Sequence, residues 1–299
     1  MRLSLLCAVV TVLLLAFILI PGTPPLAFEA VEFNSAGMPP TPFKVKQARK
    51  KGIELKPEPG IPLDGRLSKP AGDGPFPAVV LLHGCFGLQP YQDTWATHLA
   101  EWGFVVLQVD YFGPRGVEET CSDLRHAFIR GYRGDNVADA QGALAYLSDL
   151  EFVANDRVAV MGWGDSPVLR ALDRGGQERF FDRKFAAGVA FYPPCKRMAS
   201  GDFYAPLLVL VGAKDDWRLA APCESMVERS RAHALPVDLK VYPSAYHAFD
   251  DPSVGEKWYF EEAQNLAKTP TRGATLGYDP DAYEDALVTV RAFLTEHLR

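Results

Sequence analysis

Residues 78–85 read AVVLLHGC, an uninterrupted apolar run that ends in a His-Gly turn. Such a run, with no polar residue for either face, is typical of a strand that is buried on both sides of a sheet. Similar runs recur along the chain and alternate with segments of helical spacing. We predict strands over 78–82, 104–109, 157–161, 187–192, 207–211 and 239–242, and helices over 91–102, 135–150, 167–172, 223–234 and 283–298.

This alternation predicts an α/β protein with a mostly parallel central sheet and helices on both faces. In such sheets, ligands bind beyond the carboxyl ends of the strands, so the turns after the strands hold the candidate site residues. The chain has 299 residues, of which 48% are hydrophobic and 23% charged, as expected for one large globular domain over residues 44–299. Its net charge is −6 and it contains no block of Lys and Arg, so we expect no nucleic-acid partner.

The N-terminus differs from the rest of the chain. Met1-Arg2 precedes an apolar run over residues 3–20, which Pro21-Gly22 ends. This pattern indicates a secretory signal peptide or an uncleaved membrane anchor over residues 1–30. We therefore expect an exported protein, periplasmic or secreted, that is tethered to the membrane if the anchor is retained. Residues 31–43 are rich in Pro and Gly and are predicted to form a tether.

The cysteine count fits export. Besides Cys7 in the leader, the chain has Cys85, Cys121, Cys195 and Cys223. Four cysteines in an exported chain allow two disulfides in three connectivities. We favour Cys85–Cys121 and Cys195–Cys223, because each pair joins segments predicted to end near the same edge of the sheet. Four free buried thiols are the alternative.

Two strand ends supply an acid and a base. The strand over 207–211 runs into the turn GAKDD at residues 212–216, which offers Asp215 as the acid and Asp216 as the runner-up. His247 follows the strand over 239–242. A hydrolase that transfers acyl groups needs a nucleophile, an acid and a His in this chain order, because the His takes the proton of the nucleophile and the acid holds the imidazole tautomer. We predict that His247 and Asp215 form this pair.

Several of these turns, read together, resemble the dienelactone hydrolase family. The motif His83-Gly84-Cys85-Phe86-Gly87, the stretch DYFGPRG at 110–116, the turn over 212–217 and the loop over 242–250 all carry the likeness, which continues into the final helix. The resemblance implies an α/β-hydrolase fold. It also implies hydrolysis of small carboxylic esters or lactones by a Cys or Ser nucleophile in a Gly-x-Cys/Ser-x-Gly turn, together with a His and an Asp.

The sequence departs from that family at the nucleophile, because Gly164 occupies its position. In one interpretation the turn slips by two residues and Ser166 attacks, although Pro167 then lacks the backbone N–H that the oxyanion hole takes from the next residue. In a second, the carboxylate of Asp165 attacks. In a third, the site binds without hydrolysing esters, or it has borrowed another nucleophile such as Cys85.

Two functions follow. The first is a hydrolase of small esters or lactones that uses His247, Asp215 and a displaced nucleophile, with Ser166 as the leading candidate. The alternative is a non-catalytic pseudo-hydrolase that binds a small molecule. No metal or cofactor is expected, since no cluster of His, Cys and Asp has ligand spacing.

Other residues near the predicted cleft have supporting roles. Arg115 is positioned to hold a substrate carboxylate through a bidentate contact, or else to shape its own loop through a salt bridge. The backbone N–H groups of Cys85 and Phe86 are predicted as the second oxyanion donor. His83 is predicted to brace this loop. Residues 251–280 either cover the cleft as a lid or pack on the surface.

Overall fold

The computed structural model describes residues 28–38, 40, 42–56, 58–123, 132–175, 181–198, 201–233 and 237–299. The apolar run over residues 3–20, on which the prediction of a signal peptide or anchor rests, lies outside these ranges. Within them, no helix is long and apolar enough to span a membrane.

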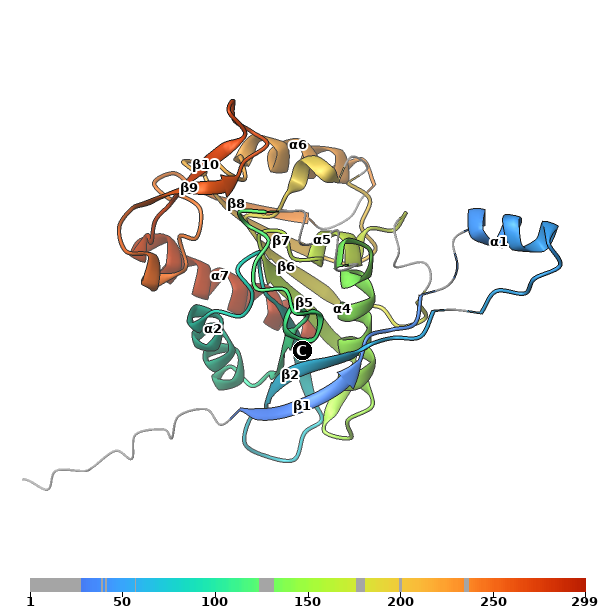
Figure 1. Ribbon diagram of the computed structural model, residues 1–299. Coiled ribbons are helices and arrows are strands. Elements are labelled where there is room, and N and C mark those ends of the chain that lie inside the picture. Colours follow the sequence, from blue (N-terminus) through green and yellow to red (C-terminus); the bar gives the residue numbers. More distant parts are fainter. Residues whose placement is uncertain are drawn as a thin grey trace, which may run out of the picture.

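An eight-stranded sheet forms the centre of the protein, with the strand order β1-β2-β4-β3-β5-β6-β7-β8 (Figure 1). The strands from β3 to β8 run parallel, whereas β2 pairs antiparallel with both β1 and β4. The mostly parallel sheet predicted from the sequence is therefore confirmed. Its strands are β1 (Glu29–Asn34), β2 (Pro62–Ser68), β3 (Phe76–Leu82), β4 (Val105–Asp110), β5 (Val153–Trp163), β6 (Ala187–Phe191), β7 (Leu207–Gly212) and β8 (Val237–Tyr242).

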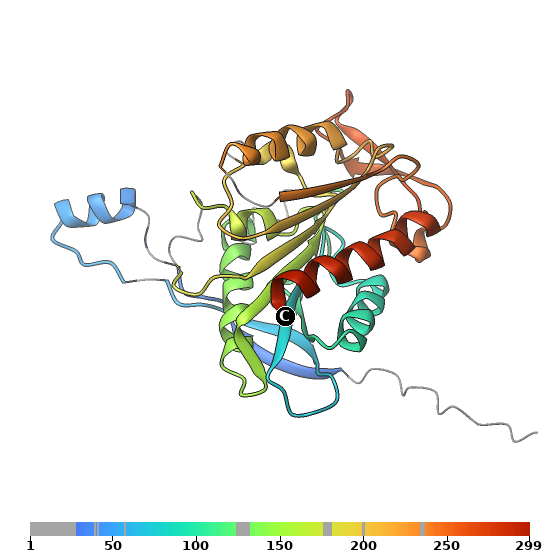
Figure 2. The same ribbon diagram turned by 180° about the vertical axis from the view of Figure 1, so that it is seen from behind.

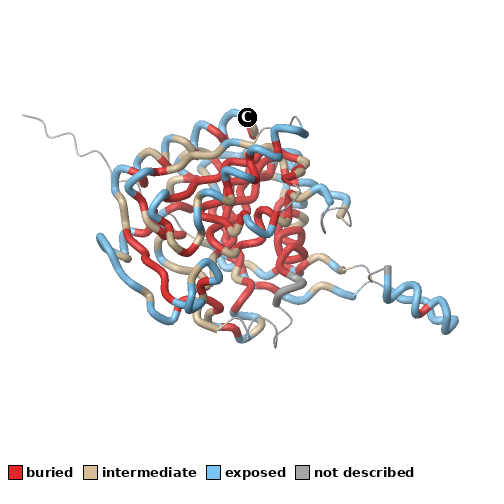
Figure 3. Tube along the Cα trace, turned by 90° about the horizontal axis from the view of Figure 1, so that it is seen from above, coloured by how far each residue is buried: buried red, intermediate tan, exposed pale blue. Residues whose placement is uncertain are grey.

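Helices cover both faces of this sheet (Figures 1 and 2). On one face lie α2 (Pro90–Glu101) and α7 (Pro280–Leu298). On the other lie α4 (Tyr132–Ser148), α5 (Val168–Leu172) and α6 (Ala220–Arg231). Seen from above, buried residues occupy the sheet and the helix sides that face it (Figure 3). The two layers of helix thus enclose two apolar cores, one on each side of the sheet.

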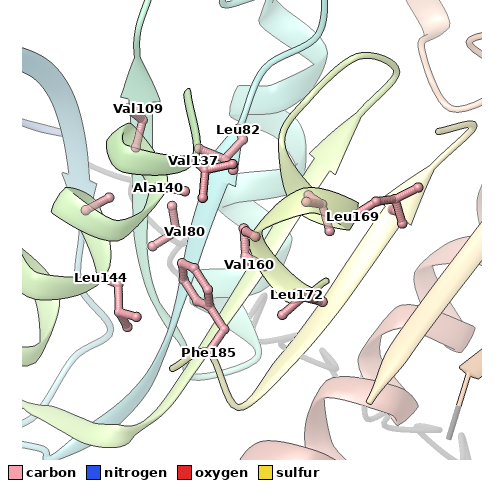
Figure 4. Close-up of a cluster of buried hydrophobic side chains, with 14 of the residues drawn as sticks. Val80, Leu82, Val109, Val137, Ala140, Leu144, Val160, Leu169, Leu172 and Phe185 are labelled. Carbon is pink, nitrogen blue, oxygen red and sulfur yellow. The ribbon is translucent and has the colours of Figure 1, made fainter. Parts of the chain in front are cut away.

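Strand β3 illustrates why the apolar run at 78–82 predicts a central strand. Successive side chains of a strand point to opposite faces. Accordingly, Val79 and Leu81 pack in the core beneath α2 and α7, while Val80 and Leu82 pack in the core beneath α4. Figure 4 shows Val80 and Leu82 beside Val137 of α4. Both faces need apolar side chains, so the strand carries no polar residue.

The structure differs from the prediction at the N-terminal edge of the sheet. The predicted tether over residues 31–43 is wrong for its first part, because β1 pairs with β2 along its whole length. Both strands are buried mainly on one face, so neither contains the apolar run that marks the central strands. Beyond β1, helix α1 (Pro42–Lys50) lies away from the sheet (Figure 1).

Residues 251–280, for which a lid and a surface segment were both considered, contain a second, two-stranded sheet. Its strands β9 (Trp258–Gln264) and β10 (Arg272–Leu276) pair antiparallel. The segment leads from the loop after β8 to the start of α7.

Both predicted disulfides are present. Cys85 is bonded to Cys121, and Cys195 is bonded to Cys223. The first joins the turn after β3 to the segment that follows β4, and the second joins the turn after β6 to α6. Each bond therefore anchors a turn at the carboxyl edge of the sheet, where the candidate site residues gather.

We expect each disulfide to stabilise the fold by about 3 kcal/mol, because it closes a chain loop in the unfolded state. The loops span 36 and 28 residues. The test is denaturant unfolding of a Cys195→Ser/Cys223→Ser double variant beside the parent. Thiol titration of the denatured, unreduced parent should find none of the four cysteines reactive, and four reactive thiols would rule the pairing out.

Candidate active site

The structure brings together the predicted acid and base. Asp215 follows β7 and His247 follows β8, and the imidazole Nδ1 of His247 lies 2.8 Å from Oδ2 of Asp215. The other oxygen of Asp215 accepts the backbone N–H groups of Trp217 (2.8 Å) and Arg218 (2.7 Å). Since Nδ1–H donates to the carboxylate, Nε2 is the nitrogen left to act as a base.

The runner-up acid has a different role. Asp216 accepts hydrogen bonds from Lys268 (2.7 Å) and from the backbone N–H and hydroxyl of Thr275 (2.8 and 3.0 Å). Burial alone would raise the pKa of Asp216, but these donors outweigh it and hold the pKa below its usual value. Asp216 therefore attaches the β9–β10 segment to the turn after β7.

The imidazole of His247 is fixed by its neighbours as well as by Asp215. Its ring lies 4.2 Å from that of Tyr192 and 4.8 Å from that of Trp217, measured between centroids. Its backbone carbonyl accepts the N–H of Gly277 at 3.0 Å, next to the end of β10. The β9–β10 segment thus supports the loop that carries His247, a role that the sequence did not reveal.

The sharp turn after β5 lies at Gly164, where the family pattern requires it. Gly164 has φ +53°, a left-handed conformation that glycine adopts without strain. Its N–H donates to the carbonyl of Phe191 at 3.0 Å. A Cβ added to Gly164 would meet no atom within 4 Å apart from those of its two chain neighbours. The turn has the sharp, left-handed shape on which α/β-hydrolases carry their nucleophile, with open space in place of the side chain.

The two residues proposed to attack from neighbouring positions point elsewhere. Ser166 is buried, and a Cβ placed on Gly162 would lie only 2.6 Å from its Oγ, so this hydroxyl packs against β5. Asp165 forms ion pairs with Arg218 (2.5 Å) and Arg197 (3.4 Å). Burial alone would raise the pKa of Asp165, but the two arginines outweigh it and hold the pKa below its usual value.

A cavity of about 440 Å³ connects Gly164 with His247, and we call it the His247 cavity. Cys85 and Phe86 line it, as the sequence predicted, and neither backbone N–H donates to a backbone carbonyl of the described residues. Cys85 is held in a disulfide, so it offers no thiolate. Much of the remaining lining is aromatic or apolar: Tyr91, Trp163, Tyr192, Ala248, Val254, Trp258 and Leu276.

Arg115 is absent from the lining of this cavity. Its guanidinium donates to the buried carboxylate of Asp139 at 2.9 Å and to the carbonyl of Tyr111 at 2.8 Å. Its side chain is only 5% exposed. Of the two roles considered for Arg115, the structure favours the salt bridge that shapes the loop.

His83 braces the loop after β3. Its ring stacks on that of Tyr111 with centroids 3.6 Å apart, and the Tyr111 hydroxyl donates to the His83 carbonyl. Nδ1 of His83 lies 2.9 Å from the carbonyl of Gly84. Burial lowers the pKa of His83 to about 4, so the ring is neutral near pH 7. These contacts fix the backbone that leads to Cys85 and Phe86.

The sequence analysis missed Asp250, three residues after His247. Its carboxylate is buried and accepts hydrogen bonds from Trp95 Nε1 (2.9 Å), Trp163 Nε1 (2.7 Å) and the Tyr192 hydroxyl (2.9 Å). Trp163 precedes Gly164, and Tyr192 packs on His247. Burial raises the pKa of Asp250 to about 6. This carboxylate therefore links Trp163, which precedes Gly164, to Tyr192, which packs on His247.

The parallel sheet, the sharp turn after β5, and the Asp and His that follow β7 and β8 together define an α/β-hydrolase. The sequence matches the model of the dienelactone hydrolase family over residues 63–298, and the chain belongs to this family. The family supports hydrolysis of lactones or esters as the general class of activity.

Individual relatives agree with this assignment. The chain is 26% identical over 202 residues to a protein of Bradyrhizobium sp. named "Probable 2-oxo-3-(5-oxofuran-2-ylidene)propanoate lactonase", and the match covers 62% of this chain and 78% of that protein. Among solved structures, a dienelactone hydrolase-like promiscuous phosphotriesterase from metagenomic libraries superposes with a TM-score of 0.64 at 20% identity, covering 91% of this chain and 100% of that one. An esterase of Pyrococcus furiosus gives a TM-score of 0.56 at 15% identity, covering 92% and 94%. At these identities the two structures support the fold alone.

Proposed function

We propose that this protein hydrolyses small carboxylic esters or lactones, with His247 and Asp215 activating a water molecule beside Gly164. The observation that carries the proposal is the intact hydrogen bond between His247 and Asp215, facing the open space at Gly164 across one cavity.

The reaction needs no covalent intermediate. A water oxygen attacks the carbonyl carbon while Nε2 of His247 takes one of its protons, and the carbonyl electrons move to the oxygen. The backbone N–H groups of Cys85 and Phe86, which line the cavity, and that of Asp165, next to Gly164 in the chain, are the candidates to stabilise the oxyanion. When the intermediate collapses, the C–O bond to the leaving group breaks and the imidazolium of His247 returns the proton to the alkoxide. The products are a carboxylic acid and an alcohol.

The position of Asp165 favours attack at Gly164 over attack at Ser166. A nucleophile at Gly164 has the N–H of Asp165 next to it, as the hydrolase mechanism requires. A nucleophile at Ser166 is followed by Pro167, which has no N–H. Losing one such donor costs about 2.7–4 kcal/mol of transition-state stabilisation. The alternative function, a pseudo-hydrolase that binds without turnover, is favoured by the missing side chain at Gly164.

The decisive test is hydrolysis of short-chain aryl esters and a small lactone by the purified parent, His247→Ala and Ser166→Ala. We expect activity in the parent, a loss of about 100-fold or more in His247→Ala because the general base is gone, and no change beyond about twofold in Ser166→Ala. Loss of activity in both variants would restore Ser166 as the nucleophile. A folded parent without activity on any of these substrates would point to the binding role.

A further inference from the structure

A second and larger cavity lies on the far side of the turn at Gly164. It has a volume of about 1050 Å³ and is bounded by the loops after β5, β6 and β7, by α6, and by the end of β9. Asp165 lines it, whereas its neighbour Gly164 lines the His247 cavity. Likewise, Cys85 lines the His247 cavity, and its disulfide partner Cys121 lines the second cavity. The two cavities are therefore neighbours separated by this turn and this disulfide.

The lining of the second cavity is strongly positive. It includes Lys196, Arg197, Arg218 and Arg229, but Asp165 is its only carboxylate among the described residues. The chain as a whole carries a net charge of −6, so this concentration of cations is local. We call it the cationic cavity. Positive charge gathered along the walls of a cleft attracts anions.

Arg218 adds a more specific observation. Its Nη2 donates to Asp165 and its Nη1 to the carbonyl of Trp217, but its Nε is buried and has no hydrogen-bond partner among the described residues. Buried donors are nearly always paired in folded proteins, so Arg218 makes fewer hydrogen bonds than its burial favours. Because Nε has almost no surface accessible to the cavity, a bound anion would reach Arg218 through the 14% of its side chain that is exposed.

The rest of the lining is apolar. Pro193, Pro194 and Pro222 contribute rigid surface, and Leu219 and Leu266 remain 45% and 69% exposed. Large apolar side chains that gather at one site beside charged groups mark a surface that takes an amphiphile. A small inorganic anion would leave this apolar surface in water. An uncharged apolar molecule would leave the positive charge that Asp165 does not balance without a counter-charge.

We propose that the cationic cavity binds an anionic amphiphile, in which a carboxylate is attached to a medium-length alkyl chain. The carboxylate pairs with the arginines and Lys196, and the apolar body covers the prolines and leucines. This site is separate from the His247 cavity, so binding there does not require hydrolysis.

The test is isothermal calorimetry of the full chain with dodecanoate, beside dodecyltrimethylammonium as the cationic match. We expect dodecanoate to bind with one molecule per chain and the ammonium compound to bind at least about tenfold more weakly. The affinity for dodecanoate should fall as salt is raised, because partly exposed charges are screened. Equal binding of the two amphiphiles would overturn the proposal.

Variants locate the site. Lys196→Gln/Arg229→Gln should weaken dodecanoate binding by about tenfold, since each lost charge contributes a few-fold to the affinity. Arg231→Gln is the matched control, because Arg231 lies on the same helix α6 as Arg229 but pairs with Glu228 at 2.8 Å outside the cavity. His247→Ala should also leave binding unchanged. An effect of His247→Ala without one of the double variant would place the ligand in the His247 cavity and contradict the proposal.

Discussion

Replacing Gly164 with serine is expected to raise the rate of ester hydrolysis by about 100-fold to 10,000-fold over the parent. The substitution restores a nucleophile to the turn where the family carries one. His247, held by Asp215, lines the same cavity as Gly164, and an added Cβ meets no atom within 4 Å apart from those of its two chain neighbours. Removing the nucleophile from a complete triad costs up to about a million-fold, so restoring it should recover a substantial part of that. The measurement is kcat/KM for a short-chain aryl ester.

The Gly164→Ala variant separates the effect of the serine hydroxyl from the effect of adding a Cβ to the turn. Both variants place a Cβ at φ +53°, which costs roughly 1–2 kcal/mol of stability, but only serine adds an oxygen. Alanine should lower the parent activity, because its methyl group occupies the place proposed for the attacking water. Gly164→Ser should also become labelled by a serine-reactive fluorophosphonate, which Gly164→Ala and the parent resist. A serine variant no faster than the alanine variant would show that His247 is not aligned for base catalysis.

The sequence best predicts the strands that are buried on both faces and the turns that follow these strands. Strands β3 and β7, and residues 158–163 of β5, are visible because their side chains are buried on both faces, and the turns that follow them contain Gly164 and Asp215. His247 follows β8, which is only partly buried, and is found through its chain order after Asp215. In contrast, β1 and β2 bury mainly one face, and β9 is largely exposed, so their patterns do not stand out from those of loops.

The direction of a side chain is harder to predict than its place in the chain. Arg115 follows a strand end near the site, but its guanidinium binds Asp139 on α4 and does not line the His247 cavity. Nothing in the local sequence identifies that partner. Asp250 was missed for the complementary reason, because its three donors come from α2, β5 and the end of β6. The one sequence signal for Asp250 is its position, three residues after the predicted catalytic His247.

Asp250→Ala is expected to lower the free energy of unfolding by about 3–5 kcal/mol. The change leaves the indole N–H groups of Trp95 and Trp163 and the hydroxyl of Tyr192 buried without their acceptor, at about 1–3 kcal/mol each before relaxation. Denaturant unfolding measures the loss. Asp285→Ala is the control: Asp285 also accepts from a tyrosine hydroxyl, that of Tyr242, but its side chain is 46% exposed, so we expect a loss below about 1 kcal/mol.

The same carboxylate should make stability depend on pH. Burial raises the pKa of Asp250 from 3.8 to about 6, so between these values the folded state binds a proton that the unfolded state has lost. The contribution of Asp250 to stability is therefore fully present below about pH 4 and falls as pH rises to about 6, by up to roughly 3 kcal/mol. Asp250→Asn keeps a polar group in place but cannot ionise, so its unfolding free energy should lack this fall. If the parent and Asp250→Asn change in parallel between pH 4 and 6, Asp250 is ionised throughout, and its three donors stabilise the charge more than burial opposes it.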